Sequence, residues 1–266
     1  MAIALRHEEN LSHEEKLTVD SLARLIRGEV ELIWHRGYYP AVLCQQALPR
    51  ITTECEAAGY TLTDDFQSLG TSLGEAAENT TNAERYLATA AETTALIRQK
   101  IFDGQLSPTD LLRLDVDELW PYGATVARYR GQTMLPGIIR RWPGGAHANP
   151  HIDQRDIPLL ESYRLTRRIG VNVYLQVPEP GNGGEIDFWG IFSSEAEYVS
   201  RKRADYGLDR TALGDPHFSV LPGQGDLLMF DAARVHGVRR VERGARVTAA
   251  CFLGVRGTSD PLVLFA

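Results

Sequence analysis

The most constraining feature of this sequence is a change of pattern near residue 121 of its 266 residues. Before that point, long stretches place apolar residues at helical spacing, and one short stretch, 29–35, alternates as a strand does. After it, short apolar runs are separated by turns that contain Gly and Pro. Helices followed by strands are typical of an α+β protein with an antiparallel sheet.

The first 120 residues carry several helix signals. Residues 20–28 place Leu22, Leu25 and Ile26 on one face, with Asp20 as the expected N-cap and Gly28 as the stop. Further helices are expected at 40–51, at 82–102 and from 107, where Ser107 caps and Pro108 follows. None of these stretches carries an obvious reactive group.

Seven apolar runs after residue 121 predict strands. They are 124–130, 137–142, 168–177, 184–190, 217–221, 225–231 and 247–255. The glycines of the segment PEPGNGG, 178–184, lie between two of these strands with no helix following, which favours a β-turn over a phosphate-binding loop. Seven or more such strands predict a sandwich or barrel. We expect residues 1–120 to pack on it as helical support within one domain, 1–266.

The charge is unevenly distributed within a net charge of −7. Residues 1–120 carry 10 Lys and Arg against 20 Asp and Glu, whereas residues 121–170 carry eight arginines against three acidic residues. A local positive field in an acidic chain suits a small anionic ligand better than a nucleic acid, which requires a basic domain. The alternative is a set of surface arginines paired with the acidic first half.

The sequence predicts a cytoplasmic protein that does not enter membranes. No apolar run approaches the roughly 20 residues that cross a bilayer, and the first residues meet charge too early for a secretory signal. The three cysteines are odd in number and lack CxxC spacing, which argues against disulfides and structural zinc. Nothing in the sequence indicates an oligomeric state.

The segment HANPHIDQRD, 147–156, concentrates two histidines and two aspartates. On a strand, His151 and Asp153 would project from the same face and could bind one cation. Two ligands hold a transition metal weakly, so a third is expected from elsewhere, and His236, after a predicted strand, is the best candidate. Two histidines and one carboxylate with the opposite side open are the ligand set of non-haem Fe(II) oxygenases.

Two further pairs could complete a binding site. Arg246 and Thr248, in the segment ARVT, share one face of a strand and would present a guanidinium and a hydroxyl to a carboxylate near the metal. Asn172 and Tyr174 share the polar face of an alternating strand. We expect this second pair to bond a ligand inside the barrel, the alternative being an outer face in contact with water.

The motifs resemble those of the Fe(II)/2-oxoglutarate-dependent oxygenases with a double-stranded β-helix, or jelly-roll, core. The matching segments are HIDQ (151–154), PGNGGEIDFW (180–189), LPGQGDLLMF (221–230) and ARVT (245–248). They cover about half of the chain, and the resemblance implies that residues 121–256 form the jelly-roll core. Within the family, the chain is most similar to small stand-alone enzymes that act on amino acids, N-acylated amino acids or natural-product intermediates.

The resemblance also implies a reaction. His151, Asp153 and His236 would hold Fe(II), and 2-oxoglutarate would chelate it, with its distal carboxylate on Arg246 and Thr248. Dioxygen would then convert 2-oxoglutarate to succinate and carbon dioxide while an unactivated C–H bond of the substrate is hydroxylated. Related halogenases replace the carboxylate ligand by Gly or Ala, so the retained aspartate implies hydroxylation rather than chlorination.

Candidates for contact with the substrate, a small and carboxylate-bearing molecule such as a free or N-modified amino acid, lie near the metal motif. They are Arg140, Arg141, Trp142, His147 and Trp189. Alternation turns one of the two arginines inward, and the sequence does not say which. His147 is alternatively a solvated loop histidine, and Trp189 alternatively a core tryptophan.

Two other functions fit parts of the pattern. A cupin-like dioxygenase or isomerase would keep the metal without 2-oxoglutarate and leave Arg246 with a surface role. A non-catalytic jelly-roll binding module would use the histidines structurally. Replacement of Arg246 tests the first alternative, and metal content tests the second.

Overall fold

The structure is a computed structural model that describes residues 11–14, 17–59, 66–154, 156–191, 195–202 and 206–266. The helices are α1 (Val19–Arg27), α2 (Ala41–Ala58), α3 (Leu73–Ala76), α4 (Thr80–Ala95), the π-helix η2 (Leu96–Ile101), α5 (Pro108–Leu119), the 3-10 helix η3 (Pro158–Tyr163), α6 (Glu195–Arg201) and α7 (Arg210–Leu213). The strands before the metal motif are β1 (Leu11–Glu14), β2 (Leu32–His35), β3 (Gln67–Leu69), β4 (Ala124–Val126), β5 (Arg128–Tyr129), β6 (Gln132–Thr133) and β7 (Ile138–Pro143). The later strands are β8 (Ala148–His151), β9 (Arg167–Gln176), β10 (Ile186–Ile191), β11 (Phe218–Val220), β12 (Leu227–Asp231), β13 (Arg234–Val238), β14 (Ala245–Val255) and β15 (Leu262–Phe265).

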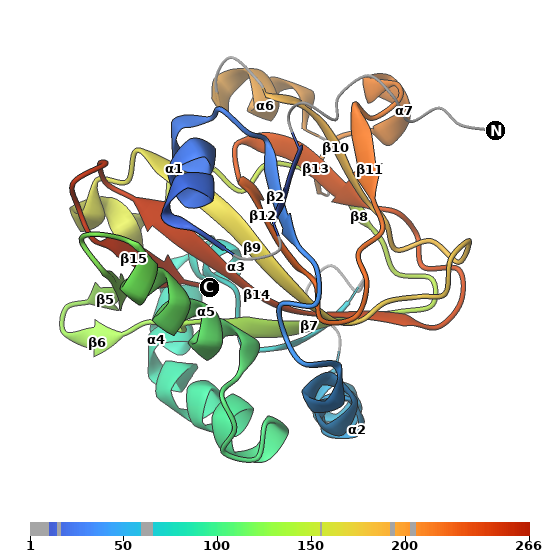
Figure 1. Ribbon diagram of the computed structural model, residues 1–266, viewed down its shortest axis with the longest axis horizontal. Helices are drawn as coiled ribbons and strands as arrows, with labels where there is room; N and C mark the ends of the chain where they lie inside the picture. The colour runs from blue at the N-terminus through green and yellow to red at the C-terminus, as the bar shows by residue number, and fades with distance from the viewer. Residues whose placement is uncertain (1–10, 15–16, 60–65, 155, 192–194, 203–205) are drawn as a thin grey trace.

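Two sheets organise the chain (Figure 1). The major sheet has nine strands in the order β1-β2-β12-β9-β14-β15-β4, and β7 joins β14 and carries β3. The minor sheet has the order β11-β10-β13-β8. Most pairings are antiparallel, and the exceptions are β1 with β2 and β15 with β4. The α+β class predicted from the sequence is therefore confirmed.

Alternation along β9 and β14 divides the major sheet into two faces. Odd-numbered residues such as Val171, Val173 and Val247 belong to the large core that also contains buried residues of α2, α4 and α5. Tyr174 and Phe230 instead pack with Ile186 and Phe188 of the minor sheet in a second core. Helices α2, α4 and α5 thus cover one face of the major sheet, and the minor sheet faces the other.

The helical half is as expected in its main features. The structure corrects the cap of α1, which is Thr18: its hydroxyl accepts from Ser21 N, and Asp20 lies in the first turn instead. Thr18 has extended dihedral angles, as an N-cap requires. Ser107 caps α5 and Pro108 follows, as predicted.

Each of the seven predicted strand segments contains a strand, and the turn at 178–184 is confirmed. Asn182 N donates to Glu179 O at 3.0 Å, the bond that closes a β-turn. Gly183 has φ 76°, and a Cβ there would lie 1.8 Å from Arg240 O, so this position requires glycine. The sequence did not predict β1, β3, β6, β8, β13 or β15, which are short or irregular in composition.

All three cysteines are free and buried, as expected. Within the described part of the chain, no helix has the length and apolarity to cross a membrane.

Candidate metal centre and its pocket

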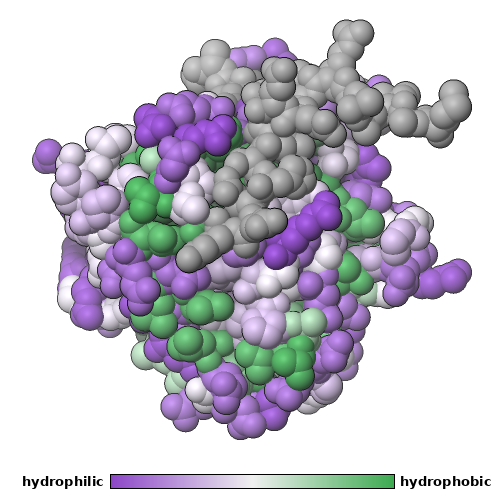
Figure 2. Space-filling model, viewed as in Figure 1, coloured by the Kyte–Doolittle hydropathy of each residue, from purple (hydrophilic) through white to green (hydrophobic). Residues whose placement is uncertain are grey.

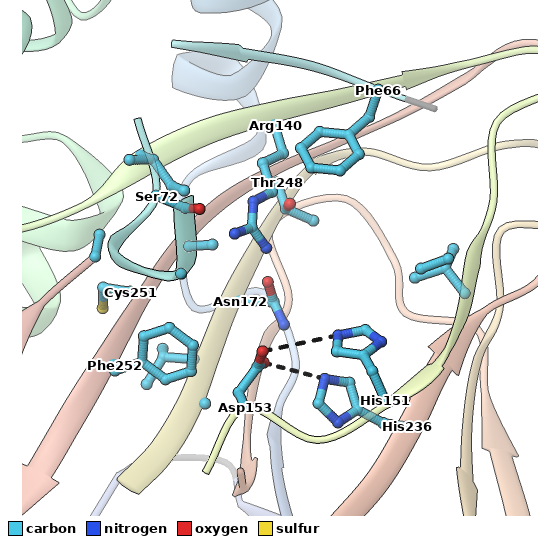
Figure 3. Close-up of a pocket in the computed structure, with 18 of the residues that line it drawn as sticks. Phe66, Ser72, Arg140, His151, Asp153, Asn172, His236, Thr248, Cys251 and Phe252 are labelled. Carbon is cyan, nitrogen blue, oxygen red and sulfur yellow. Dashed lines mark ion pairs between the residues drawn. The ribbon is translucent and has the colours of Figure 1, made fainter. Parts of the chain in front are cut away.

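The pairing of β8 with β13 brings the two predicted histidines together. His151 and His236 are register partners, and their ring centroids lie 4.4 Å apart. The sequence interpretation assumed that Asp153 lies on a strand with His151. The structure corrects this, because β8 ends at His151. The backbone of Asp153 instead bonds Ala232 O at 2.8 Å, which turns the carboxylate back toward the imidazoles (Figure 3).

The three side chains converge through their ligand atoms. Asp153 Oδ2 lies 3.3 Å from His236 Nε2, and Asp153 Oδ1 lies 3.8 Å from His151 Nε2. One ligand atom from each residue lies within 4.8 Å of the other two. No other group of three or more such residues occurs in the parts of the chain that the structure describes.

The hydrogen bond at Nδ1 of each imidazole determines whether Nε2 carries a proton or a lone pair. His151 Nδ1 lies 2.8 Å from Asn149 O, and His236 Nδ1 lies 2.9 Å from Arg234 O. A carbonyl oxygen can only accept, so each neutral ring is protonated at Nδ1 and directs the Nε2 lone pair at the carboxylate. Lone pairs facing a carboxylate repel unless a cation lies between them, so these residues fit a bound metal ion.

The electrostatics favour the same conclusion. Burial, together with the neighbouring His236, lowers the pKa of His151 to about 4, which keeps its imidazole neutral at pH 7. Burial raises the pKa of Asp153, but the neighbouring His236, His151 and Arg140 lower it by more, so the pKa lies below its usual range. A carboxylate and neutral imidazoles are ligands that divalent transition metals prefer.

A cavity of about 230 Å³ opens beside the cluster. It lies between the sheets, and its wall includes Trp142, Asn172, Val238 and Phe252. Figure 3 shows Arg140 and Asn172 pointing into this space, with Ser72 and Phe252 across it from the histidines. The cavity is sized for small molecules.

The Arg246 guanidinium lies at the buried end of the pocket wall. Its Nη2 donates to Tyr174 Oη at 3.1 Å, and its carbon lies 5.0 Å from the Tyr174 ring centroid and 5.7 Å from that of Trp142. Its Nε has no hydrogen-bond partner among the described residues. Thr248 lines the same pocket, and Tyr174 is fully buried behind the arginine.

The structure settles which of the two adjacent arginines faces inward. Arg140 lines the pocket, opposite Thr248 in the register of β7 and β14. Arg141 points to the other face, where it donates to Gln67 Oε1 at 2.6 Å and lies 3.5 Å from Glu56. Arg141 is therefore removed from the set of candidate substrate contacts.

His147 and Trp189 also lie outside the pocket. The pairing of β8 with β13 shifts register between His236 and Val238, so the parity that the sequence interpretation gave to His147 and His151 does not hold. In β10, Phe188 is the register partner of His236, so Trp189 faces the other way. Its Nε1 donates to Gly214 O at 3.1 Å, as in the core-tryptophan interpretation.

The sequence interpretation did not identify the residues by which the helical half contributes to the pocket. Phe66, Ser72, Glu75 and Glu78 line it, and Phe66 stacks on Trp142 with centroids 4.2 Å apart. The Ser-x-x-Glu spacing at 72–75 is a capping-box signature that could have located α3. No sequence signal indicates that α3 lies beside the metal motif.

No family model matches the sequence. Over 160 residues, 58% of this chain and 58% of the relative, it is 28% identical to the L-gamma-glutamyl-L-propargylglycine hydroxylase of Streptantibioticus cattleyicolor. Over 136 residues, 48% of this chain and 46% of the relative, it is 27% identical to the L-isoleucine 3(1)-dioxygenase of Pantoea ananatis. The chain thus spans about half of the length of these curated relatives.

The fold is shared more widely than the sequence. An N-substituted L-amino acid dioxygenase from Burkholderia ambifaria AMMD superposes with a TM-score of 0.63 over 93% of this chain and 91% of that one, at 17% identity. Its complex with alpha-KG gives 0.60 at 16% identity, with the same coverage. HygX from Streptomyces hygroscopicus, with nickel and 2-oxoglutarate bound, gives 0.51 at 16% identity over 90% and 88% of the two chains. The resemblance to the Fe(II)/2-oxoglutarate-dependent oxygenases is confirmed.

Proposed function

We propose that this protein is an Fe(II)- and 2-oxoglutarate-dependent dioxygenase that hydroxylates an unactivated C–H bond of a free or N-modified amino acid. The observation that carries the proposal is the convergence of His151, Asp153 and His236 at the end of a small-molecule pocket. The curated relatives, named for their action on amino acids, support the substrate class. We further propose that 121–256 forms a jelly-roll core within a single domain, 1–266.

His151, Asp153 and His236 would hold the metal ion at the edge of the pocket. The bound iron would supply the activation of dioxygen, with which 2-oxoglutarate becomes succinate and carbon dioxide and the substrate gains one hydroxyl group. The retained carboxylate of Asp153 supports hydroxylation rather than halogenation, because it fills the position that a halide would need.

The protein's own residues would hold and orient the two organic molecules. Arg246 and Thr248 would bind the distal carboxylate of 2-oxoglutarate, with Tyr174 fixing the guanidinium from behind. Asn172 projects into the same pocket between Arg140 and the metal ligands, where its amide can bond either molecule (Figure 3). Phe252 and Trp142 supply apolar walls that exclude water from the reacting bond.

The test is substrate-dependent release of succinate. Protein supplied with Fe(II), 2-oxoglutarate and oxygen is expected to release succinate when an amino acid is added, and His151→Ala and His236→Ala are expected to abolish the release. Arg246→Leu is expected to weaken 2-oxoglutarate binding by about a hundredfold, since two charge-assisted hydrogen bonds of about 1.5 kcal/mol each are lost. Unchanged binding in this variant would favour the cupin-like alternative.

Metal content provides a second test of the proposed function. Protein purified without chelator is expected to bind one divalent transition metal, and His236→Ala is expected to lose it. Failure of the wild-type protein to bind Fe(II), Mn(II) or 2-oxoglutarate would favour the non-catalytic binding module. A cytoplasmic location is also proposed, supported by the three free, buried thiols.

A further inference from the structure

We infer that the pocket binds its substrate as a zwitterion, with a carboxylate on Arg140 and a free ammonium group facing Glu75 and Glu78. This inference rests on the proposed function and narrows its substrate class, from free or N-modified amino acids to those that keep a cationic amine. It is carried by three charged side chains of one pocket that the described residues leave without ion-pair partners.

Arg140 is the first of these side chains. Its guanidinium points into the cavity between Thr248 and Asn172 (Figure 3), and its Nε is buried without a hydrogen-bond partner. The ring of Phe66 lies 5.4 Å from the guanidinium carbon, and no carboxylate in the described part of the chain forms an ion pair with it. Arg140 is half-buried, but its Nε is cut off from water without a partner, so a ligand carboxylate is the expected partner.

Glu75 and Glu78 form the opposite charge. Both line the pocket: Glu75, half-buried, lies in α3, whose Leu73 and Ala76 are buried and anchor the helix, and Glu78, exposed, follows the end of that helix. Glu75 Oε2 accepts from Ser72 N at 2.8 Å and from Ser72 Oγ at 3.0 Å, which fixes the side chain. Neither glutamate pairs with a basic residue of the described chain, so a cationic ligand group can bind both.

The separation of the two poles is the informative feature. Arg140 and the glutamates line one cavity, and no ion pair forms between them in the described residues. A molecule that carries both charges can therefore meet the opposite sign at each of its ends. Phe66 and Phe252 then contact the aliphatic part of such a molecule.

The same geometry disfavours N-acylated substrates. Acylation converts the ammonium group to a neutral amide, which removes the positive charge that would face Glu75 and Glu78. Lys202 also lines the pocket and is the rival partner for the carboxylate. It is exposed, however, so it retains its hydration, whereas the Arg140 Nε cannot reach water.

The first experiment compares matched substrates. A panel of free L-amino acids and γ-glutamyl dipeptides, each with its N-acetyl counterpart, is supplied with Fe(II), 2-oxoglutarate and oxygen, and succinate is measured. The best free compound is expected to exceed its N-acetyl counterpart at least about tenfold in kcat/KM, the effect of losing one charge-assisted contact. Preference for the N-acetyl set, or no response to either set, would overturn the inference.

Charge-neutral variants locate the two poles. Glu75→Gln keeps the capping box, because glutamine serves at that position, and is combined with Glu78→Gln. This double variant and Arg140→Gln are each expected to raise the KM and the calorimetric Kd of the free amino acid about tenfold. The matched controls are Glu84→Gln and Arg85→Gln, on exposed positions of α4 outside the pocket, and are expected to change neither.

Binding of 2-oxoglutarate to the Mn(II)-loaded protein, measured by calorimetry without oxygen, separates the possible failures. It is expected to stay within about twofold of wild type in Arg140→Gln and in the Glu75→Gln/Glu78→Gln variant, because neither pole contacts the co-substrate. Loss of 2-oxoglutarate binding in Arg140→Gln would assign this arginine to the co-substrate and overturn the carboxylate pole. A KM for the free amino acid that rises in Lys202→Gln but not in Arg140→Gln would also overturn the assignment of the carboxylate to Arg140. Absence of 2-oxoglutarate binding to the wild type would instead refute the proposed function itself.

Discussion

Tyr174 stands behind Arg246, and its hydroxyl accepts a hydrogen bond from the guanidinium in a fully buried site. Replacement by phenylalanine removes that bond but keeps the ring under the guanidinium. We predict that Tyr174→Phe weakens 2-oxoglutarate binding about tenfold, since a hydrogen bond to a charged group contributes about 1.5 kcal/mol or more. Calorimetry on the Mn(II) protein measures this.

Tyr39→Phe is the matched control for that prediction. It removes another buried hydroxyl, which donates to Leu106 O at 2.7 Å away from the pocket. It is expected to lower stability without changing 2-oxoglutarate affinity. Equal affinity loss in both variants would show that Tyr174 acts only through the general stability of the fold.

Arg168 holds the proposed metal ligand Asp153 through its backbone. It is buried, and its Nη1 donates to Asp153 O at 3.1 Å, just beyond the end of β8. We predict that Arg168→Lys, which keeps the charge but loses the planar fork, lowers Mn(II) affinity about tenfold, the lower range for groups that orient metal ligands. Competition with a metal-binding dye measures the affinity, and an unchanged Kd would contradict the positioning role.

For single residues, the sequence was sufficient to identify some members of the candidate site and not others. His151, Asp153 and His236 were found because their residue types and spacing carry the chemistry directly. The choice between Arg140 and Arg141 was not accessible, because it depends on the absolute register of β7, which its pairing with β14 sets. His147 was misplaced for a related reason, since an irregularity in the β8–β13 pairing breaks the parity that alternation assumes.

At the scale of elements, the start of α5 is tied to η2 by charge. Asp110 is buried; Arg98 Nε donates to it at 2.9 Å and Ser107 Oγ at 2.7 Å. Burial alone would raise the pKa of Asp110, but the hydrogen bonds from Arg98 and Ser107 lower it by more than burial raises it. The pKa of Asp110 therefore lies below its usual value. We predict that Asp110→Asn destabilises the protein by about 1 kcal/mol at pH 7, a modest figure because Arg98 is partly exposed.

The pH dependence of that effect follows from the sign of the shift. A carboxyl whose pKa is lower in the folded state stabilises the fold above its unfolded pKa, near 4, and the contribution is lost as the pH falls through the folded pKa. The difference in urea midpoint between wild type and Asp110→Asn is therefore expected to be largest at neutral pH and to narrow below about pH 4. A difference that is independent of pH would contradict the ionic contribution.

Helices and strands could be predicted from the sequence where the pattern that indicates them lies within the segment itself. The long, regular strands β9 and β14 and the capped helix α5 follow from alternation and capping. The strands β8 and β13 carry the two histidines of the candidate metal centre but were missed as strands, because Asn149, Pro150 and Gly237 weaken any alternating pattern. Their pairing depends on contacts from distant parts of the chain, which a local pattern does not contain.

At the scale of the whole molecule, the site lies where the parts of the chain meet. His151 and His236 come from the minor sheet, Arg246 and Asn172 from the major sheet, and the pocket wall around Ser72 from the helical half. In the space-filling view, polar and apolar residues alternate over the visible surface without one dominant apolar area (Figure 2).

This arrangement predicts that ligands stabilise the entire fold together. With the metal on the minor sheet and the distal carboxylate on the major sheet, bound 2-oxoglutarate would connect the two, so Mn(II) plus 2-oxoglutarate is expected to raise Tm more than the sum of each alone. A ligand at a hundred times its Kd adds about 2.7 kcal/mol, which corresponds to about 5–10 °C for a protein of this size. Scanning calorimetry of the wild type, of His236→Ala and of Arg246→Leu checks it: His236→Ala should lose the metal-dependent shift and Arg246→Leu only the 2-oxoglutarate increment. Equal Tm shifts in all three proteins would mean that the ligands bind elsewhere. Strictly additive Tm shifts in the wild type would mean that Mn(II) and 2-oxoglutarate do not share one site between the sheets.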